Sequence, residues 1–209
     1  MTKTVSDRPG KIVCVGRNYS EHAKELGNAV PKEPLLFLKP PSSVIREGEA
    51  IVMPAQSNQV EFEGEIGVVI GSRLSHATVT DAAGSIRGIC ALNDVTARDL
   101  QKTDGQWTRA KGFDTFCAIG PESAAPKDLK TLMVLTRVNG VERQRGAAAD
   151  MVFSIPELLS YISGIMTLEP GDVVATGTPA GVGKLAAGDV VEIEIPGFSK
   201  VRNPVTNTV

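Results

Sequence analysis

The sequence predicts a fold that is mainly β with a few short helices, in a single domain that spans residues 1–209. Most apolar residues fall in short runs rich in Val, Ile and Leu, and Gly, Pro, Asn or Asp end these runs, as is typical of strands. Asn139-Gly140 separates two such runs, which is a strong hairpin signal. Sustained helical spacing of apolar residues is clearest in the segment 154–166.

Taken in order, the chain has many short strand-like segments and few helices. The first helix is expected to begin at Asn18, with Glu21 at its third position, to run through Leu26 and to end at Gly27. A helical turn is expected at 81–86, a short helix at 96–102, and the longest helix at 154–166, where Ser154 is the expected N-cap. Strands are expected at 11–16, 35–39, 66–70, 88–93, 132–138, 141–144, 172–176, 189–195 and 200–205.

Composition excludes several classes of protein. The net charge of −2 and the absence of a basic stripe argue against nucleic-acid binding. No apolar run reaches the ~18–20 residues that a membrane span needs, and the polar N-terminus lacks the apolar core of a signal peptide. Cys14, Cys90 and Cys117 are odd in number and have apolar neighbours, so they are expected to be reduced core thiols of a cytoplasmic protein.

The stretch 58–65 carries three carboxylates that a strand would place on one face. Glu61, Glu63 and Glu65 share that face because side chains alternate along a strand. A hard divalent cation such as Mg²⁺ would relieve their mutual repulsion. A solvated acidic edge strand would explain the same pattern, so spacing alone leaves both interpretations open.

Asp94 follows the strand expected at 88–93, where a side chain can reach a cleft. With two of the three glutamates it would complete an oxygen-ligand set for Mg²⁺ or Mn²⁺. The alternative is that Asn93 or Asp94 caps the helix expected at 96–102.

Two further positions are candidates for proton transfer. Glu25 follows His22 by three residues on the same helix face, so a carboxylate could orient the imidazole as a general base, although an incidental surface pair has the same spacing. Lys111 lies among aromatic residues that would partly desolvate it, and it could stabilise an enolate oxygen, or it could be an ordinary surface lysine. His76 is expected to be solvated.

The glycine-rich segment 176–184 does not match a phosphate-binding loop. Counting back from Gly183-Lys184, the first glycine of that motif falls on Thr178, and Leu185 stands where Ser or Thr is required. The segment is expected to be a turn whose backbone N–H groups and Thr178 hydroxyl could hold a carboxylate.

An ordered set of motifs resembles the fumarylacetoacetate hydrolase superfamily. These motifs extend from residue 12 to about residue 183 in family order. They are VGRNY at 15–19, HAKE at 22–25, LFLKP at 36–40, EGEI at 63–66, NDVTARDLQ at 93–101, the stretch 107–113, DMVFS at 150–154 and GTP at 177–179.

The resemblance implies a fold, a cofactor and a set of residue roles. It implies the family's mixed β-sandwich roll, usually as a homodimer, with Mg²⁺ or Mn²⁺ bound by Glu63, Glu65 and Asp94 and with Glu61 outside the ligand set. It implies that Lys111 faces the enolate-forming oxygen and that His22 and Glu25 form the dyad that activates water or relays a proton. It implies that Arg17, Gln101 and Thr178 line the substrate pocket.

A 2-oxo acid substrate bound in this way predicts chemistry through a metal-stabilised enolate. The branches left open are hydrolysis of an acylpyruvate, decarboxylation of oxaloacetate and isomerisation of a 2-hydroxydienoate dicarboxylate, in catabolism of aromatic compounds or of central 2-oxo acids. A non-catalytic metal- or ligand-binding protein of the same fold is the alternative. Residues 147–149 are alanines where many family members carry a polar residue, so a substrate or loop hydrogen bond is expected to be missing there.

Overall fold

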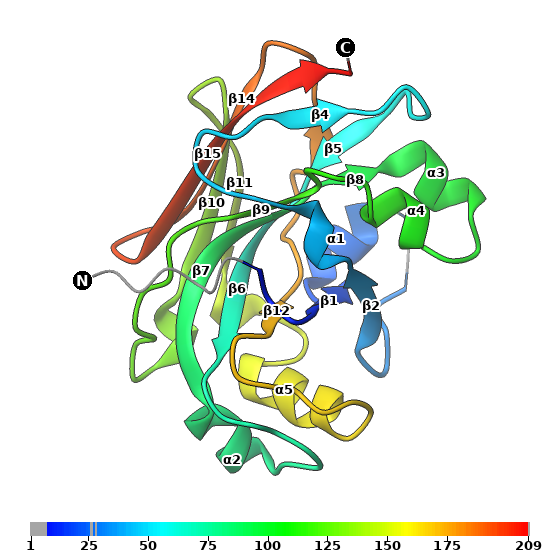
Figure 1. The fold of residues 1–209 in the computed structure, drawn as a ribbon. Coiled ribbons are helices and arrows are strands. Elements are labelled where there is room, and N and C mark those ends of the chain that lie inside the picture. Colours follow the sequence, from blue (N-terminus) through cyan, green and yellow to red (C-terminus); the bar gives the residue numbers. More distant parts are fainter. Residues whose placement is uncertain (1–7, 26, 28, 209) are drawn as a thin grey trace.

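Three β-sheets form the framework of the computed structural model, which describes residues 8–25, 27 and 29–208 (Figure 1). A seven-stranded mixed sheet has the order β2 (Leu35–Lys39), β1 (Ile12–Gly16), β12 (Val173–Ala175), β6 (Gly64–Ile70), β7 (Ile86–Asp94), β9 (Cys117–Ile119) and β3 (Val44–Ile45). A five-stranded sheet has the order β11 (Val141–Ala147), β10 (Met133–Val138), β14 (Val190–Ile195), β15 (Ser199–Asn207) and β4 (Ile51–Met53). A small third sheet joins β13 (Gly183–Lys184), β5 (Val60–Phe62) and β8 (Thr96–Ala97).

The main core lies between the two larger sheets. β10, β14 and β15 pack against β6 and β7, so apolar side chains of both sheets interdigitate. Ile66, Val68, Ile89, Ile193 and Val201 are fully buried there, and each such side chain contributes about 1.5–3 kcal/mol by leaving water. The architecture is the mainly β, mixed β-sandwich roll that the sequence predicted.

The helices are short and lie at the edges of the sheets. They are α1 (Ser20–Glu25), α2 (Val79–Gly84), α3 (Arg98–Thr103), α4 (Thr108–Lys111) and α5 (Ile155–Ser163). α2 packs against α5 at one end of the molecule, whereas α3 and α4 pack together beside β8 (Figure 1). Single 3₁₀ turns occur at Pro41–Ser43, Leu129–Thr131 and Ala148–Asp150.

Two predicted helix starts need correction. Asn18 does not cap α1, because its buried amide bonds the backbone of Phe153 and the carbonyl of Thr176 instead. The helix expected at 96–102 begins at Arg98, since Thr96 and Ala97 pair with β5 as β8. Leu26, within the predicted first helix, and residues 1–7 of the polar N-terminus lie outside the described residues.

Other local predictions are confirmed. Ser154 and Glu157 form a reciprocal capping box at the start of α5. Asn139 and Gly140 both have positive φ, 52° and 79°, as a two-residue hairpin turn requires. Gly27 has φ 68°, the left-handed conformation expected where a helix ends.

The pairing of β6 with β7 positions the candidate site. Gly64 is opposite Asn93, and the N–H of Asp94 donates to the carbonyl of Glu63 at 2.9 Å. The end of β7 therefore lies beside the start of β6, where the chain passes from β5. Among the described helices, none is long and apolar enough to cross a membrane.

Candidate active site

Three carboxylates converge where β6 begins and β7 ends. Glu63, Glu65 and Asp94 each offer an oxygen, and these oxygens lie within 4.8 Å of one another. The three residues are 5%, 1% and 0% exposed. β6 lies between β12 and β7 inside its sheet, so the acidic edge strand considered from the sequence is wrong.

Two lysines and an arginine pair with this cluster. The ammonium of Lys111 lies 2.7 Å from Glu63 Oε2 and 2.7 Å from Asp94 Oδ2, which rules out a surface lysine. Lys39 donates to Asp94 Oδ1 at 2.6 Å, and Arg98 pairs with Glu63. With both carboxylate oxygens engaged in this way, Asp94 is not a helix cap.

Glu61 lies beside the cluster and outside it. Its carboxylate accepts from Arg98 Nε at 2.7 Å and from the amide of Gln59 at 2.6 Å. Glu61 lies on β5, Glu63 between β5 and β6, and Glu65 on β6. Arg98 bridges Glu61 and Glu63, so Glu61 is tied to the cluster through this arginine.

Among the described residues, Glu65 is the carboxylate of this group without an ion-pair partner. Lys39, Arg98 and Lys111 pair with the carboxylates of Glu61, Glu63 and Asp94. The ion pairs go to the other three carboxylates, whereas Glu65 accepts from the N–H of Gly177 at 2.7 Å.

The pKa values follow this distribution. Burial raises the pKa of Glu65 well above its ordinary value, and the neighbouring Asp94 and Glu63 raise it further. Burial would also raise the pKa of Glu63, but Lys111 and Arg98 together outweigh it and hold that pKa well below its usual range. A cluster of buried carboxylate oxygens, one of which is held by a backbone N–H rather than by a cationic side chain, suits a hard divalent cation, so the residues present fit the implied metal.

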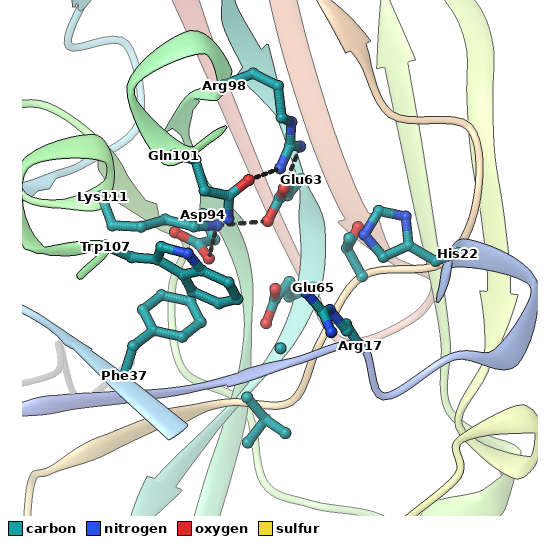
Figure 2. A pocket seen from close by; sticks show the side chains of 13 residues that line it. Arg17, His22, Phe37, Glu63, Glu65, Asp94, Arg98, Gln101, Trp107 and Lys111 are labelled. Atoms are coloured by element: carbon teal, nitrogen blue, oxygen red, sulfur yellow. Dashed lines mark hydrogen bonds and ion pairs between the residues drawn. The ribbon is translucent and has the colours of Figure 1, made fainter. Parts of the chain in front are cut away.

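The predicted dyad is formed. His22 Nδ1 lies 3.1 Å from Glu25 Oε2, and His22 is 4% exposed, so it is no incidental surface residue. Glu25 in turn accepts from the N–H of Gly181 at 3.0 Å. The imidazole is therefore held by a carboxylate that the glycine-rich turn anchors. Figure 2 shows His22 on the opposite side of the carboxylates from Lys111.

The carboxylate cluster, His22 and Lys111 line one pocket. The three predicted substrate contacts line it as well, namely Arg17, Gln101 and Thr178. Arg17 has φ 60°, a strained conformation for a side chain of its size, which is typical of functional sites. Gln101 accepts from Arg98. The Thr178 hydroxyl donates to the carbonyl of Gly64 at 2.9 Å, so the backbone already holds it.

The turn at 176–184 binds carboxylates, as its composition suggested. These carboxylates are side chains of the protein itself and not those of a ligand. Its N–H groups bind Glu65 through Gly177 and Glu25 through Gly181.

Some pocket residues were missed from the sequence. Arg98, Phe37 and Trp107 line the pocket, and Lys39 supports Asp94 from outside it. The Phe37 and Trp107 rings meet edge to face at 5.3 Å, and the Lys111 ammonium lies 4.9 Å from the Phe37 ring centre (Figure 2). Arg98 could have been found, because the predicted helix places it one turn before Gln101.

Known proteins are similar to this chain in sequence and in fold. Residues 11–206 match the model of the fumarylacetoacetate (FAA) hydrolase C-terminal family. The mitochondrial oxaloacetate tautomerase of Arabidopsis thaliana is 46% identical over 205 residues, which are 95% of this chain and 92% of that protein.

Two solved structures are similar throughout. The 5-carboxymethyl-2-hydroxymuconate delta-isomerase of Mycobacterium smegmatis has a TM-score of 0.90 and 40% identity, covering 100% of this chain and 82% of that one. The fumarylpyruvate hydrolase of Pseudomonas aeruginosa, in complex with Mn²⁺ and pyruvate, has a TM-score of 0.89 and 30% identity, covering 95% and 90%. The chain belongs to the fumarylacetoacetate hydrolase family.

Proposed function

We propose that the chain is a divalent-metal-dependent enzyme that moves a proton beside the carbonyl of a 2-oxo dicarboxylate, with keto–enol interconversion of oxaloacetate as the leading reaction. The observation that carries the proposal is the buried cluster of Glu63, Glu65 and Asp94, which faces both Lys111 and the His22–Glu25 pair. The oxaloacetate tautomerase relative supports the choice of substrate.

Glu63, Glu65 and Asp94 would hold Mg²⁺, or Mn²⁺ as in the Pseudomonas complex. When bound, such a cation supplies Lewis-acid stabilisation of negative charge on an enolate oxygen. It would also place a positive charge beside Glu65, whose partner in the structure is the N–H of Gly177.

The protein's own groups account for binding and proton transfer. Arg17, whose guanidinium lines the pocket, binds the carboxylate remote from the carbonyl. His22 is oriented by Glu25, so it can take the proton from the carbon next to the carbonyl and return it to the oxygen, which converts keto to enol without net proton loss. The Lys111 ammonium donates a hydrogen bond to the oxygen on which charge develops.

Hydrolysis of an acylpyruvate such as fumarylpyruvate is the second candidate. The same His22–Glu25 pair that returns a proton could activate water, and the Pseudomonas relative is a hydrolase. Decarboxylation of oxaloacetate and isomerisation of a 2-hydroxydienoate would use the same pocket. A non-catalytic binder of the same fold is disfavoured, since it would not require a buried Lys111 or an oriented His22.

The test is a substrate panel with defined variants. Oxaloacetate tautomerisation and decarboxylation, and turnover of fumarylpyruvate, acetylpyruvate and 2-hydroxyhepta-2,4-dienedioate, are measured with Mg²⁺ or Mn²⁺ and after treatment with EDTA. Oxaloacetate enol–keto exchange, followed by ultraviolet absorbance, should be accelerated and should require the metal. His22→Ala should reduce kcat by about 10²–10⁴-fold, whereas His76→Ala, the same change at the exposed second histidine, should not.

The outcomes separate the candidates. Turnover of fumarylpyruvate without acceleration of oxaloacetate exchange would replace the leading reaction by hydrolysis. If no compound turned over while the protein bound Mn²⁺, the enzymatic proposal would be wrong and the binding protein would be favoured.

A further inference from the structure

Gln144 is a buried amide on a strand whose first half is exposed. It lies on β11, at the edge of the five-stranded sheet, between the exposed residues Arg143 and Arg145. Its side chain is directed toward the other sheet, and only 1% of the residue is exposed. A position that could have held an aliphatic side chain instead holds an amide, which is costly to bury unless it is fully bonded.

The amide of Gln144 is fully bonded, and its partners belong to the candidate site. Its oxygen accepts from the N–H of Gly64 at 3.0 Å. Its nitrogen donates to the Thr178 hydroxyl at 2.7 Å and to the carbonyl of Pro179 at 2.8 Å. Because Thr178 also donates to the carbonyl of Gly64, both polar groups of Gly64 are held by this network.

Gly64 lies between Glu63 and Glu65 in the chain, so the position of its two peptide groups determines how far apart these two glutamates lie. The approach of the two sheets is close here: a Cβ on Gly64 would lie 2.0 Å from the Thr136 hydroxyl and 3.2 Å from the Gln144 oxygen. The glycine-rich turn approaches β11 as closely, since a Cβ on Gly181 would lie 2.1 Å from the Arg143 carbonyl oxygen. Residues 143–144 thus contact both Gly64, which lies between Glu63 and Glu65 in the chain, and the turn that binds Glu65 and Glu25.

We propose that Gln144 is a positioning residue for the divalent cation. It does not line the pocket, but it holds Gly64 and the Thr178 turn in a single arrangement, so that the carboxylates of Glu63 and Glu65 meet one ion. The cation is that of the proposed function, on which this inference rests. In metal sites generally, residues that hydrogen-bond to the ligands from outside the coordination sphere hold those ligands in place, and loss of such a residue typically lowers metal affinity 10–100-fold. Gln144 would have the same effect through its hydrogen bonds to the backbone between two ligands.

The experiment compares Gln144→Met with a matched control. Met keeps most of the volume but leaves the N–H of Gly64 and the carbonyl of Pro179 without this partner. Asn203→Leu is the control, because the buried Asn203 amide also bridges two carbonyls, those of Arg46 and Glu49 at 2.7 and 2.8 Å, and does not line the pocket. Gln144→Asn, with an amide too short for both partners, is a milder second variant should Gln144→Met fold poorly.

Mn²⁺ affinity is measured without substrate, by calorimetry and by quenching of the single tryptophan, Trp107, which lines the pocket. We expect Gln144→Met to weaken Mn²⁺ binding about tenfold and Gln144→Asn to fall between it and the wild type. Both Gln144→Met and Asn203→Leu should lower Tm, but Asn203→Leu should leave the Mn²⁺ Kd within about twofold, because outer-shell partners rather than remote amides tune metal affinity.

The result can be separated from the fate of the proposed function. Equal Mn²⁺ affinity in wild type and Gln144→Met would overturn the positioning role, even if turnover changed. Equal loss of Mn²⁺ affinity in Asn203→Leu would also overturn it, since general destabilisation would then suffice. Mn²⁺ binding that depends on Gln144, in a protein that does not act on oxaloacetate, would support the positioning role and reject the reaction.

Discussion

Glu65 is the buried carboxylate of the site that no cationic side chain pairs among the described residues, and this has a consequence for stability. Its carboxyl pKa is raised in the folded protein by burial and by Asp94 and Glu63, whereas in the unfolded chain it titrates normally. Below the unfolded pKa the group is protonated in both states and contributes nothing. As pH rises above that value, the unfolded chain releases the proton first, so the metal-free folded state loses stability.

Glu65→Gln should therefore stabilise the metal-free protein. The amide does not ionise in either state, so this loss of stability with rising pH is absent, and its oxygen can still accept from Gly177. Thermal unfolding in EDTA should show a Tm gap that is near zero at pH 4.5 and widens toward pH 8; a gain of order 1 kcal/mol corresponds to about 2–4 °C in a chain of this size. Excess Mn²⁺ should reverse the order of the two proteins. A Tm for Glu65→Gln below that of the wild type in EDTA at pH 8 would contradict this account.

Among the individual site residues, those that strand alternation or a family motif indicates were predicted from the sequence. It placed Glu63 and Glu65 on one face and Asp94 at a strand end, and the structure brings the three together. It could not predict Lys39, because this lysine ends a strand next to Pro40-Pro41, where local sequence favours solvent. Only the tertiary pairing of β2 with β1 carries its ammonium to Asp94. The roles assigned to His22, Lys111 and the other site residues stay predictions until the variants are measured.

Among the elements, strands with clear boundaries were predicted best. The runs at 35–39 and 189–195 became β2 and β14 almost unchanged, because Gly or Pro punctuates their ends. β3, β4, β8, β9 and β13 were not predicted. These short strands pair with segments that are distant in sequence, which local patterns do not record.

The hairpin between β10 and β11 provides a test of a single conformational effect. Gly140 has φ 79°, and no heavy atom would lie within 4 Å of an added Cβ, so Gly140→Ala adds backbone strain without a clash. We expect a loss of about 1–2 kcal/mol in unfolding free energy, measured by urea denaturation, with unchanged turnover. Gly84→Ala is the matched control, because Gly84 also has open space but lacks positive φ and ends α2. It should be neutral or stabilise by up to about 1 kcal/mol, and an equal loss in both variants would show that φ is not the cause.

For the whole molecule, the seven-stranded sheet connects the site to the core. Cys117 on β9 is paired with Asp94, and Cys14 and Cys90 lie on β1 and β7 of the same sheet. All three thiols are free and fully buried, in the apolar cluster that also contains Val69 and Leu92. Composition predicted buried thiols, but it could not place them on one face of one sheet, because their grouping depends on strand order. The single domain, the homodimer and the cytoplasmic location remain predictions.

The three thiols should therefore report on opening of the entire sheet. Burial raises the pKa of Cys90 and of Cys117 to about 12 and raises that of Cys14 well above its usual value, so reactive thiolate is scarce in the folded state at pH 8. With a thiol reagent in excess, we expect negligible fast labelling of the native protein, rapid labelling of all three thiols in denaturant, and one shared slow rate under native conditions. Mn²⁺ at about 100 times its Kd should slow that native labelling about 100-fold, since ligand binding stabilises the folded state by about 2.7 kcal/mol. The Glu65→Gln variant should lose this protection. Fast labelling of one thiol in the native protein, unaffected by Mn²⁺, would show that its strand opens separately from the site.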